Sequence, residues 1–296
     1  MKPTTAERVL AAWRSKTVVP AFNIPYLPMM EPTIRALRDS GCFGLIMVAR
    51  LEWTKFQAQS IEAIAEEYHR VKDERFTRLH LDHVPVIDED NLRVDFEEDI
   101  RRAIAAGYES VMVDGSRLSL AENIHCTRQI VELAHAAGIP VEGELGAVMG
   151  HEAGEMPPYE ELFASGRGFT DPAEARRFVH ETGVDWLSVA IGNVHGAIVR
   201  ATRDRQKPTA RLALPHLEKI QAAARVPLVL HGGTGIRQQD VLEGIRRGIA
   251  KINIATATRQ PYERLMGESI SAAQTAVYDA AVHLLRDELG PPLAIP

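Results

Sequence analysis

The amino-acid sequence predicts an α/β fold, namely a (β/α)8 barrel with additional helices at both ends of the chain. Short runs rich in Val, Ile and Leu alternate with amphipathic helical segments, and eight such runs occur within 296 residues. Polar residues also collect where the runs end, which is where barrels of this kind hold their active sites. A doubly wound open sheet is the alternative, because a hydrophobic pattern leaves the number of strands open.

The expected strands are short β-branched runs bounded by polar or turn-forming residues. They span residues 18–23, 43–49, 78–82, 110–114, 140–144, 186–190, 227–231 and 251–254. The expected helices lie between the strands and carry apolar residues at three- and four-residue spacing. They include residues 61–71, 100–106, 120–137, 173–182 and 217–224.

Residues with known capping preferences stand at the ends of several expected helices. Thr4 and Glu7 have the spacing of a capping box, which predicts a helix near the N-terminus. Asp171, followed directly by a proline, is typical of a helix start. Three glycines follow expected helices as C-terminal caps do, namely Gly107, Gly138 and Gly183.

The composition argues against several classes of protein. The formal net charge is −6 and no basic face is evident, so nucleic-acid binding is not expected. Cys42 and Cys126 are the only cysteines and lie far apart, which suits a reducing compartment better than a disulfide framework. No apolar stretch resembles a signal sequence or a membrane span. We therefore expect a cytoplasmic protein without a membrane partner, with residues 1–296 forming one domain.

Three histidines stand at or just after the ends of three expected strands. These are His83, His195 and His231. The carboxyl ends of barrel strands meet at one rim, so the three imidazoles are expected to lie close together. Catalytic zinc keeps three protein ligands and leaves a position open for water or substrate. This pattern predicts a catalytic metal site.

Other polar residues stand at the ends of the expected strands or directly after them. They are Asn23, Arg50, Asp82, Asp114, Glu144 and Asn253. Any one of them alone is most simply a capping or loop residue. Their convergence at one rim favours an active site.

Seven segments resemble, in order, those of the class II metal-dependent ketose-bisphosphate aldolases, which include the fructose- and tagatose-bisphosphate enzymes. They are VPAFNI (19–24), HLDH (80–83), SVMVDGS (110–116), VEGELG (141–146), AIGNVHG (190–196), LVLHGGTG (228–235) and KINIAT (251–256). The resemblance covers about residues 4–260. Residues 261–296 match poorly and are expected to form divergent C-terminal helices.

The resemblance implies that His83, His195 and His231 bind one catalytic Zn²⁺ ion. In a Lewis-acid role this ion polarises a ketone and stabilises an enediolate. Asp114 and Glu144 match family carboxylates near the metal. They are expected either to hydrogen-bond its ligands or to offer an alternative metal position, and structural salt bridges remain an alternative.

The resemblance also implies two acid–base groups. Asp82 is expected to take the proton of the hydroxyl beyond the breaking carbon–carbon bond. Strand alternation would place Asp82 and His83 on opposite faces, so the strand must end or bend there for both to reach one site. Glu152, in the glycine- and proline-rich loop 147–168, matches the family residue that protonates the enediolate carbon. An unrelated surface glutamate is the alternative for Glu152.

A glycine-rich turn directly follows His231. Barrels commonly bind phosphate at the ends of the seventh and eighth strands, using backbone N–H groups and hydroxyls. The resemblance implies that Asn253 hydrogen-bonds the enediolate oxygen and that a monovalent cation, Na⁺ or K⁺, lies near the phosphate. The residues expected to hold the phosphate of dihydroxyacetone phosphate are Gly196, Gly232, Gly233, Thr234 and Thr256.

At the other end of the expected substrate, Asn23 and Arg259 match family positions that contact a second phosphate. Arg50 stands where serine or threonine is usual, and the loop 84–95 is longer than in the family. A guanidinium can pair with a carboxylate or phosphate in fork geometry. We hypothesise from this that the aldehyde product is anionic; a purely space-filling Arg50 is the alternative.

These observations together predict a zinc-dependent aldolase. The expected reaction is the reversible cleavage of a ketose 1-phosphate or 1,6-bisphosphate to dihydroxyacetone phosphate and an aldehyde. The resemblance also implies a homodimer or a homotetramer. The alternatives are a metalloenzyme of the same barrel with a different reaction, and a non-catalytic relative that binds a metabolite.

Overall fold

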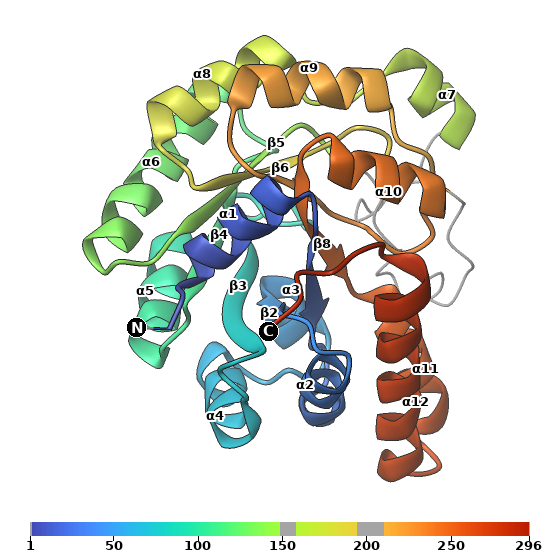
Figure 1. The fold of residues 1–296 in the computed structure, drawn as a ribbon. Helices are drawn as coiled ribbons and strands as arrows, with labels where there is room; N and C mark the ends of the chain where they lie inside the picture. The colour runs from blue at the N-terminus through green and yellow to red at the C-terminus, as the bar shows by residue number, and fades with distance from the viewer. Residues whose placement is uncertain (1, 149–157, 194–209, 296) are drawn as a thin grey trace.

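Eight parallel strands close into a barrel in the computed structural model, which describes residues 2–148, 158–193 and 210–295. Neighbouring strands pair in chain order from β1 to β8, and β8 pairs in parallel with β1. Helices surround this barrel on the outside (Figure 1). The predicted (β/α)8 barrel is therefore confirmed. The pairing of the first strand with the last distinguishes it from a doubly wound open sheet.

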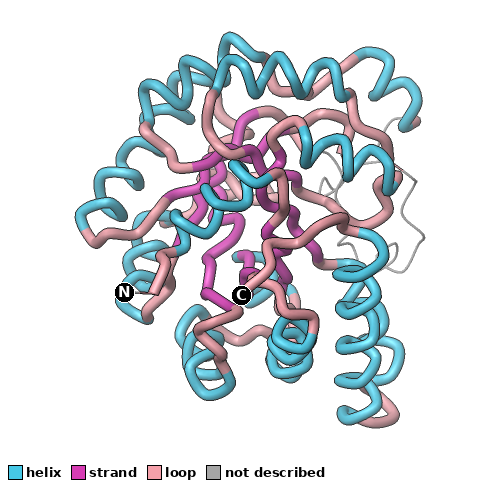
Figure 2. The backbone as a smooth tube through the Cα atoms, viewed as in Figure 1, coloured by secondary structure: helices cyan, strands magenta, loops and turns pink. Residues whose placement is uncertain are grey.

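The strands are short and almost entirely buried, as expected for a barrel covered by helices on the outside. They form the centre of the molecule in Figure 2. The strands are β1 (Val19–Asn23), β2 (Gly44–Ala49), β3 (Thr77–Pro85), β4 (Ser110–Asp114), β5 (Val141–Leu145), β6 (Trp186–Val189), β7 (Leu228–Leu230) and β8 (Ile249–Ile254). Each overlaps its predicted run, and β3 continues past its predicted end at residue 82.

Helices follow the strands around the barrel, with additional helices at both ends of the chain. They are α1 (Thr5–Ser15), α2 (Met30–Asp39), α3 (Arg50–Lys55), α4 (Ile61–Val71), α5 (Phe96–Ala106), α6 (Leu120–Ala136), α7 (Tyr159–Ser165), α8 (Pro172–Thr182), α9 (Leu214–Ala224), α10 (Gln238–Arg246), α11 (Thr256–Leu265) and α12 (Ile270–His283). The predicted capping box of Thr4 and Glu7 begins α1, Asp171 caps α8, and Gly107 and Gly183 end α5 and α8 in left-handed conformation.

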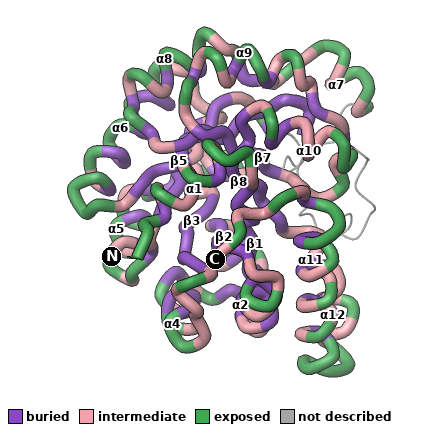
Figure 3. Tube along the Cα trace, in the orientation of Figure 1, coloured by how far each residue is buried: buried purple, intermediate pink, exposed green. Residues whose placement is uncertain are grey.

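Two apolar clusters stabilise the barrel. The larger fills the layer between the strands and the surrounding helices, and the smaller lies inside the barrel beneath α1. Figure 3 shows this pattern as buried strands inside a ring of helices with exposed outer faces. Among the described residues, no helix is long and apolar enough to cross a membrane.

The C-terminal tail helps to close the amino-terminal end of the barrel. Leu293 N–H donates to Val18 O (2.8 Å), and Phe43 N–H donates to Leu293 O (2.8 Å). Leu293 and Ile295 also pack against the apolar cluster beneath α1. Because Val18 and Phe43 directly precede β1 and β2, the tail covers the amino-terminal end of the barrel.

Candidate active site

Three strands direct pairs of polar side chains into the barrel near its carboxyl end. Residues two apart on a strand point to the same face, so each strand supplies a neighbouring pair. The pairs are His80 and Asp82 on β3, Glu142 and Glu144 on β5, and Lys251 and Asn253 on β8. All six side chains are buried. A barrel interior this polar needs an extensive set of hydrogen bonds, because burying unpaired polar groups is costly.

A bulge in β3 brings Asp82 and His83 to the same site. The register between β3 and β4 shifts between Leu81 and Val84, and His83 has a positive φ of 35°. A bulge of this kind re-aims a side chain that regular alternation would turn away. The prediction that the strand must end or bend at this point is thereby confirmed.

Two carboxamides hold the carboxylate of Asp82. Asn253 Nδ2 donates to Oδ1 at 2.9 Å, and Asn23 Nδ2 donates to Oδ2 at 3.0 Å. Burial alone would raise the pKa of Asp82, but the nearby His83 and Lys251 lower it. Asp82 is therefore kept ionised, with each oxygen hydrogen-bonded, inside the barrel near the carboxyl end of β3.

Beside Asp82, His83 and His231 form the core of a candidate metal centre. Their ring centroids are 4.4 Å apart, and one ligand atom from each lies within 4.8 Å of the others and of an Asp82 oxygen. His83 Nδ1 lies 3.4 Å from Asp114 Oδ2, and His231 Nδ1 lies 3.3 Å from Glu144 Oε2. Imidazoles surrounded by carboxylates suit a divalent transition metal, so these residues fit the expected ion.

Charge at this centre favours a bound cation. Burial lowers the pKa of His83, but Glu144, Asp82 and Asp114 outweigh burial and raise it to about 10. Burial likewise opposes ionisation of Asp114, yet the hydrogen bond from His83 lowers its pKa to about 2. The carboxylates therefore create a negative potential that stabilises positive charge at the position of His83.

Behind the candidate metal centre lies a buried ion-pair network. His231 Nε2 donates to Glu142 Oε1 at 2.8 Å, and Lys251 Nζ donates to Glu142 Oε2 at 2.8 Å. Trp186 Nε1 donates to the same Oε2 at 2.6 Å. Because the Nε2–H of His231 is hydrogen-bonded to Glu142, Nδ1 is the nitrogen that faces Glu144 and the candidate metal centre. A carboxylate behind a histidine in this way sets the tautomer of a metal ligand.

Lys251 also determines the orientation of the Asn253 amide. Lys251 Nζ lies 2.7 Å from Asn253 Oδ1. An ammonium only donates and an ionised carboxylate only accepts, so Oδ1 must face Lys251 and Nδ2 must face Asp82. The orientation of the Asn253 amide is thereby fixed, and its Nδ2 carries a second N–H that can serve another acceptor.

The predicted phosphate loop approaches β8 closely. Gly232 has a φ of 64°, and Gly233 N–H donates to Asn253 O at 3.0 Å. A Cβ at Gly233 would lie 2.4 Å from Ile252 Cγ2 and 2.9 Å from Asn253 O, so only glycine fits there. Thr256 is the first residue of α11, where backbone N–H groups favour an anion.

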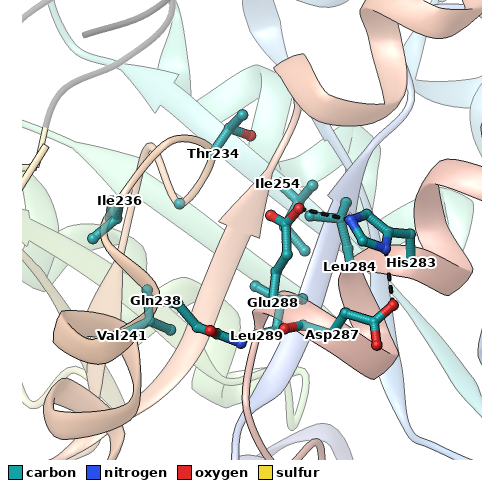
Figure 4. A pocket seen from close by; sticks show the side chains of 11 residues that line it. Thr234, Ile236, Gln238, Val241, Ile254, His283, Leu284, Asp287, Glu288 and Leu289 are labelled. Carbon is teal, nitrogen blue, oxygen red and sulfur yellow. Dashed lines mark hydrogen bonds and ion pairs between the residues drawn. The ribbon is translucent and has the colours of Figure 1, made fainter. Parts of the chain in front are cut away.

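A pocket of about 230 Å³ borders this loop. Gly233 and Thr234 line it together with residues of the C-terminal segment (Figure 4). His283 contacts Asp287 and Glu288 along its wall, and Gln238 at the start of α10 donates to the backbone of Asp287. The C-terminal segment thereby contacts α10, the helix that follows this loop.

The predicted distal residues lie at the ends of β1 and β2 and on α11. Asn23 Nδ2 lies 3.4 Å from Glu52 Oε2, and Arg259 Nη1 forms an ion pair of 2.5 Å with Glu263. Arg50, the first residue of α3, pairs with acidic side chains of the β3–α5 loop and of α5. Each of these predicted residues is thus in contact with a carboxylate.

Three predicted site residues, Glu152, His195 and Gly196, lie outside the described residues. Glu142 and Lys251 were not predicted from the sequence, although each stands two residues before a predicted site residue on the same strand. That spacing, together with a charge inside a buried strand, is the signal that would have found them. Glu52, whose carboxyl group accepts the N–H of Ala49, was not predicted either. His80, in the HLDH segment, has its Nδ1 2.8 Å from Ser110 Oγ.

Comparison with known proteins shows which family the chain belongs to. The family model of class II fructose-bisphosphate aldolase matches residues 4–288. The match therefore extends past residue 260, where the resemblance noted in the sequence ends, and it includes α11 and α12. The structure of the YdjI aldolase from Escherichia coli K12 matches with a TM-score of 0.75 and 26% identity, covering 98% of this chain and 99% of that one. Fructose-bisphosphate aldolase from Campylobacter jejuni shares the fold at 16% identity and a TM-score of 0.72, covering 97% and 95%.

Proposed function

Because the chain belongs to the class II fructose-bisphosphate aldolase family, we propose that it catalyses the reversible cleavage of a ketose 1-phosphate or 1,6-bisphosphate. The products would be dihydroxyacetone phosphate and an aldehyde. The observation that carries this proposal is the doubly hydrogen-bonded carboxylate of Asp82, which lies beside His83 and His231 in the barrel mouth.

The cofactor of the proposed reaction is one Zn²⁺ ion per chain. We assign its ligands to His83, His231 and His195. Imidazole ligands suit zinc, and their neutral charge preserves its Lewis acidity. The bound ion would polarise the ketone of the substrate. Asp114 and Glu144 would orient His83 and His231, or would offer the ion an alternative position.

Asp82 is the proposed base for carbon–carbon cleavage. Its ionised oxygens can accept the proton of the substrate hydroxyl beyond the breaking bond. Asn253, locked by Lys251, would donate its second N–H to the enediolate oxygen of the remaining fragment. This donor is prepared before reaction and needs no reorganisation as negative charge develops. We assign protonation of the enediolate carbon to Glu152.

Substrate phosphate is proposed to bind at the ends of β7 and β8. The close approach of Gly233 to β8 and the N-terminus of α11 at Thr256 support this assignment. The remaining members of the proposed phosphate site are Gly196, Gly232 and Thr234, with Na⁺ or K⁺ nearby. We place Asn23, Arg50 and Arg259 around the opposite end of the bound substrate.

We further propose that the protein is cytoplasmic, that residues 1–296 form one domain, and that the chain assembles as a homodimer or homotetramer. The family match over residues 4–288 supports the single domain. The two cysteines, Cys42 and Cys126, are both free and buried, as suits a reducing compartment.

Proton exchange of dihydroxyacetone phosphate in deuterated water tests the proposed function. The zinc-loaded protein should exchange one carbon-bound proton, observed by NMR, and a chelator should stop the exchange. The measurement needs no knowledge of the aldehyde, because enediolate formation precedes aldehyde addition. Absence of exchange in a folded, zinc-loaded protein would instead favour a different reaction or a metabolite-binding role.

A further inference from the structure

Arg50 is anchored to the β3–α5 loop and to α5 by two carboxylates. Its Nη1 lies 3.4 Å from Asp88 Oδ2, and its Nε lies 3.6 Å from Asp99 Oδ2. The Asp88 side chain is only 7% exposed. A guanidinium that left this position would leave a buried carboxylate without its cation, which is strongly unfavourable. Arg50 therefore acts as an anchor for the long loop after His83.

A second cation of α3 holds the same loop. Lys55 Nζ lies 2.7 Å from Glu89 Oε1 and 2.8 Å from Asp90 Oδ2. Arg259 on α11 forms its ion pair with Glu263. In the part of the chain that the structure describes, the cations that flank the distal end of the site each have a carboxylate partner.

Glu52 lies one side chain away from the proposed base. Its Oε2 accepts the backbone N–H of Ala49 at 2.8 Å and the amide of Asn23 at 3.4 Å. The Asn23 amide in turn donates to Asp82. Burial, opposed by the Ala49 N–H and reinforced by Asp82, raises the pKa of Glu52 to about 8. We call Glu52 and Asn23 the distal wall of the site. At neutral pH this wall presents a carboxyl and a carboxamide, which hydrogen-bond well to hydroxyl groups.

On the basis of the aldolase function proposed above, we propose that the substrate is a ketose 1-phosphate whose aldehyde fragment ends in uncharged, hydroxylated carbons. Arg50 then serves to hold the loop 84–95, and Asn23 and Glu52 bind the hydroxyls of the aldehyde. A second phosphate would approach the carboxylates of Asp88 and Asp99, and could recruit Arg50 only by breaking both of its ion pairs. This proposal replaces the anionic aldehyde that the sequence alone suggested.

The direct test compares aldehydes that differ only in a phosphate. Zinc-loaded wild-type protein would be assayed for addition of dihydroxyacetone phosphate to glycolaldehyde, D-glyceraldehyde and L-glyceraldehyde, and to the phosphate ester of each. We expect the best uncharged aldehyde to have a kcat/KM at least tenfold above that of its ester. An ester that reacts as well as its uncharged partner, or better, would overturn the proposal.

A pair of charge variants tests the part played by Arg50. Asp88→Asn with Asp99→Asn frees the guanidinium, while the amide oxygen introduced at position 88 can still accept the N–H groups of residues 90 and 92. We expect the preference to move at least tenfold towards the phosphorylated aldehyde. The control, Glu89→Gln with Asp90→Asn, removes the same charge from the same region but leaves Arg50 paired. Equal shifts in both variants would show that general charge, and not Arg50, sets the preference.

The same preparations separate this proposal from the proposed function. Exchange of the dihydroxyacetone phosphate proton does not involve the aldehyde or the distal wall. Absence of exchange in the wild-type protein would refute the proposed aldolase function itself. Normal exchange combined with a preference for phosphorylated aldehydes would refute only the inference about the distal wall.

Discussion

Replacement of Lys251 by methionine should strongly destabilise the fold. Lys251 and Glu142 are both fully buried, and the variant would leave the Glu142 carboxylate hydrogen-bonded to Trp186 and His231 but without its lysine. Breaking a buried ion pair by removing one partner typically costs about 3–5 kcal/mol. Methionine fills nearly the same volume, so little of this cost would come from a cavity.

Urea unfolding of the metal-free protein at pH 7, followed by circular dichroism, would measure the change in the free energy of unfolding. The matched control is Lys55→Met, because Lys55 also pairs with carboxylates but is 36% exposed. Partly exposed ion pairs contribute about 0–1 kcal/mol, so the control should lose no more than that.

A double variant separates lost charge from lost shape. Lys251→Met combined with Glu142→Gln leaves no uncompensated charge, and should recover most of the stability lost in the single variant. If the single variant lost less than about 1 kcal/mol, the network would not need Lys251 as its counter-charge. If the double variant were no better than the single one, shape rather than charge would explain the loss.

Three further outcomes follow from the site. For Glu52→Gln, the unfolded chain loses the Glu52 proton near pH 4.5 whereas the folded protein keeps it to about pH 8, so wild-type stability falls as pH rises through this window. Relative to wild type, the variant should gain at most about 4 kcal/mol between pH 5 and 8 in urea unfolding, and no relative gain would contradict the buried carboxyl. Asp82→Asn should bind metal normally yet cleave substrate about 10²–10⁴-fold more slowly; normal turnover would exclude Asp82 as the base. Gly233→Ala should lower stability by about 1–3 kcal/mol in the same assay because its methyl group overlaps β8, and an unchanged midpoint would argue against this close approach.

Local patterns along the chain predicted most of the secondary structure. Runs of β-branched residues and capping residues such as Thr4, Asp171 and Gly183 act over a few neighbouring positions, so their effect can be read without the fold. The need for a bend between Asp82 and His83 also followed from strand alternation. The way the chain meets that need, a bulge with a positive φ at His83, depends on how β3 pairs with β4.

The charge environment of the site could not be predicted in the same way. Arg50 was expected to meet an anion of the substrate, but in the fold it meets Asp88 and Asp99, which come from the loop after the next strand and from α5. In the sequence, Arg50 stands out as an unusual residue at a strand end. The carboxylates that the folded loop brings to Arg50 cannot be predicted from the sequence, because ion pairs depend on distance in space.

By itself, the sequence determined the alternation of strands and helices and the chemical types of residue at the strand ends, including His83 and His231. The tertiary structure alone decided the closure of β8 onto β1 and the ion pair between Glu142 and Lys251, which are 109 residues apart. The physical reason is that propensity and alternation act between near neighbours, whereas barrel register decides which distant side chains share the low-dielectric interior. Buried charges must then find partners there, and those partners orient His231 and Asn253.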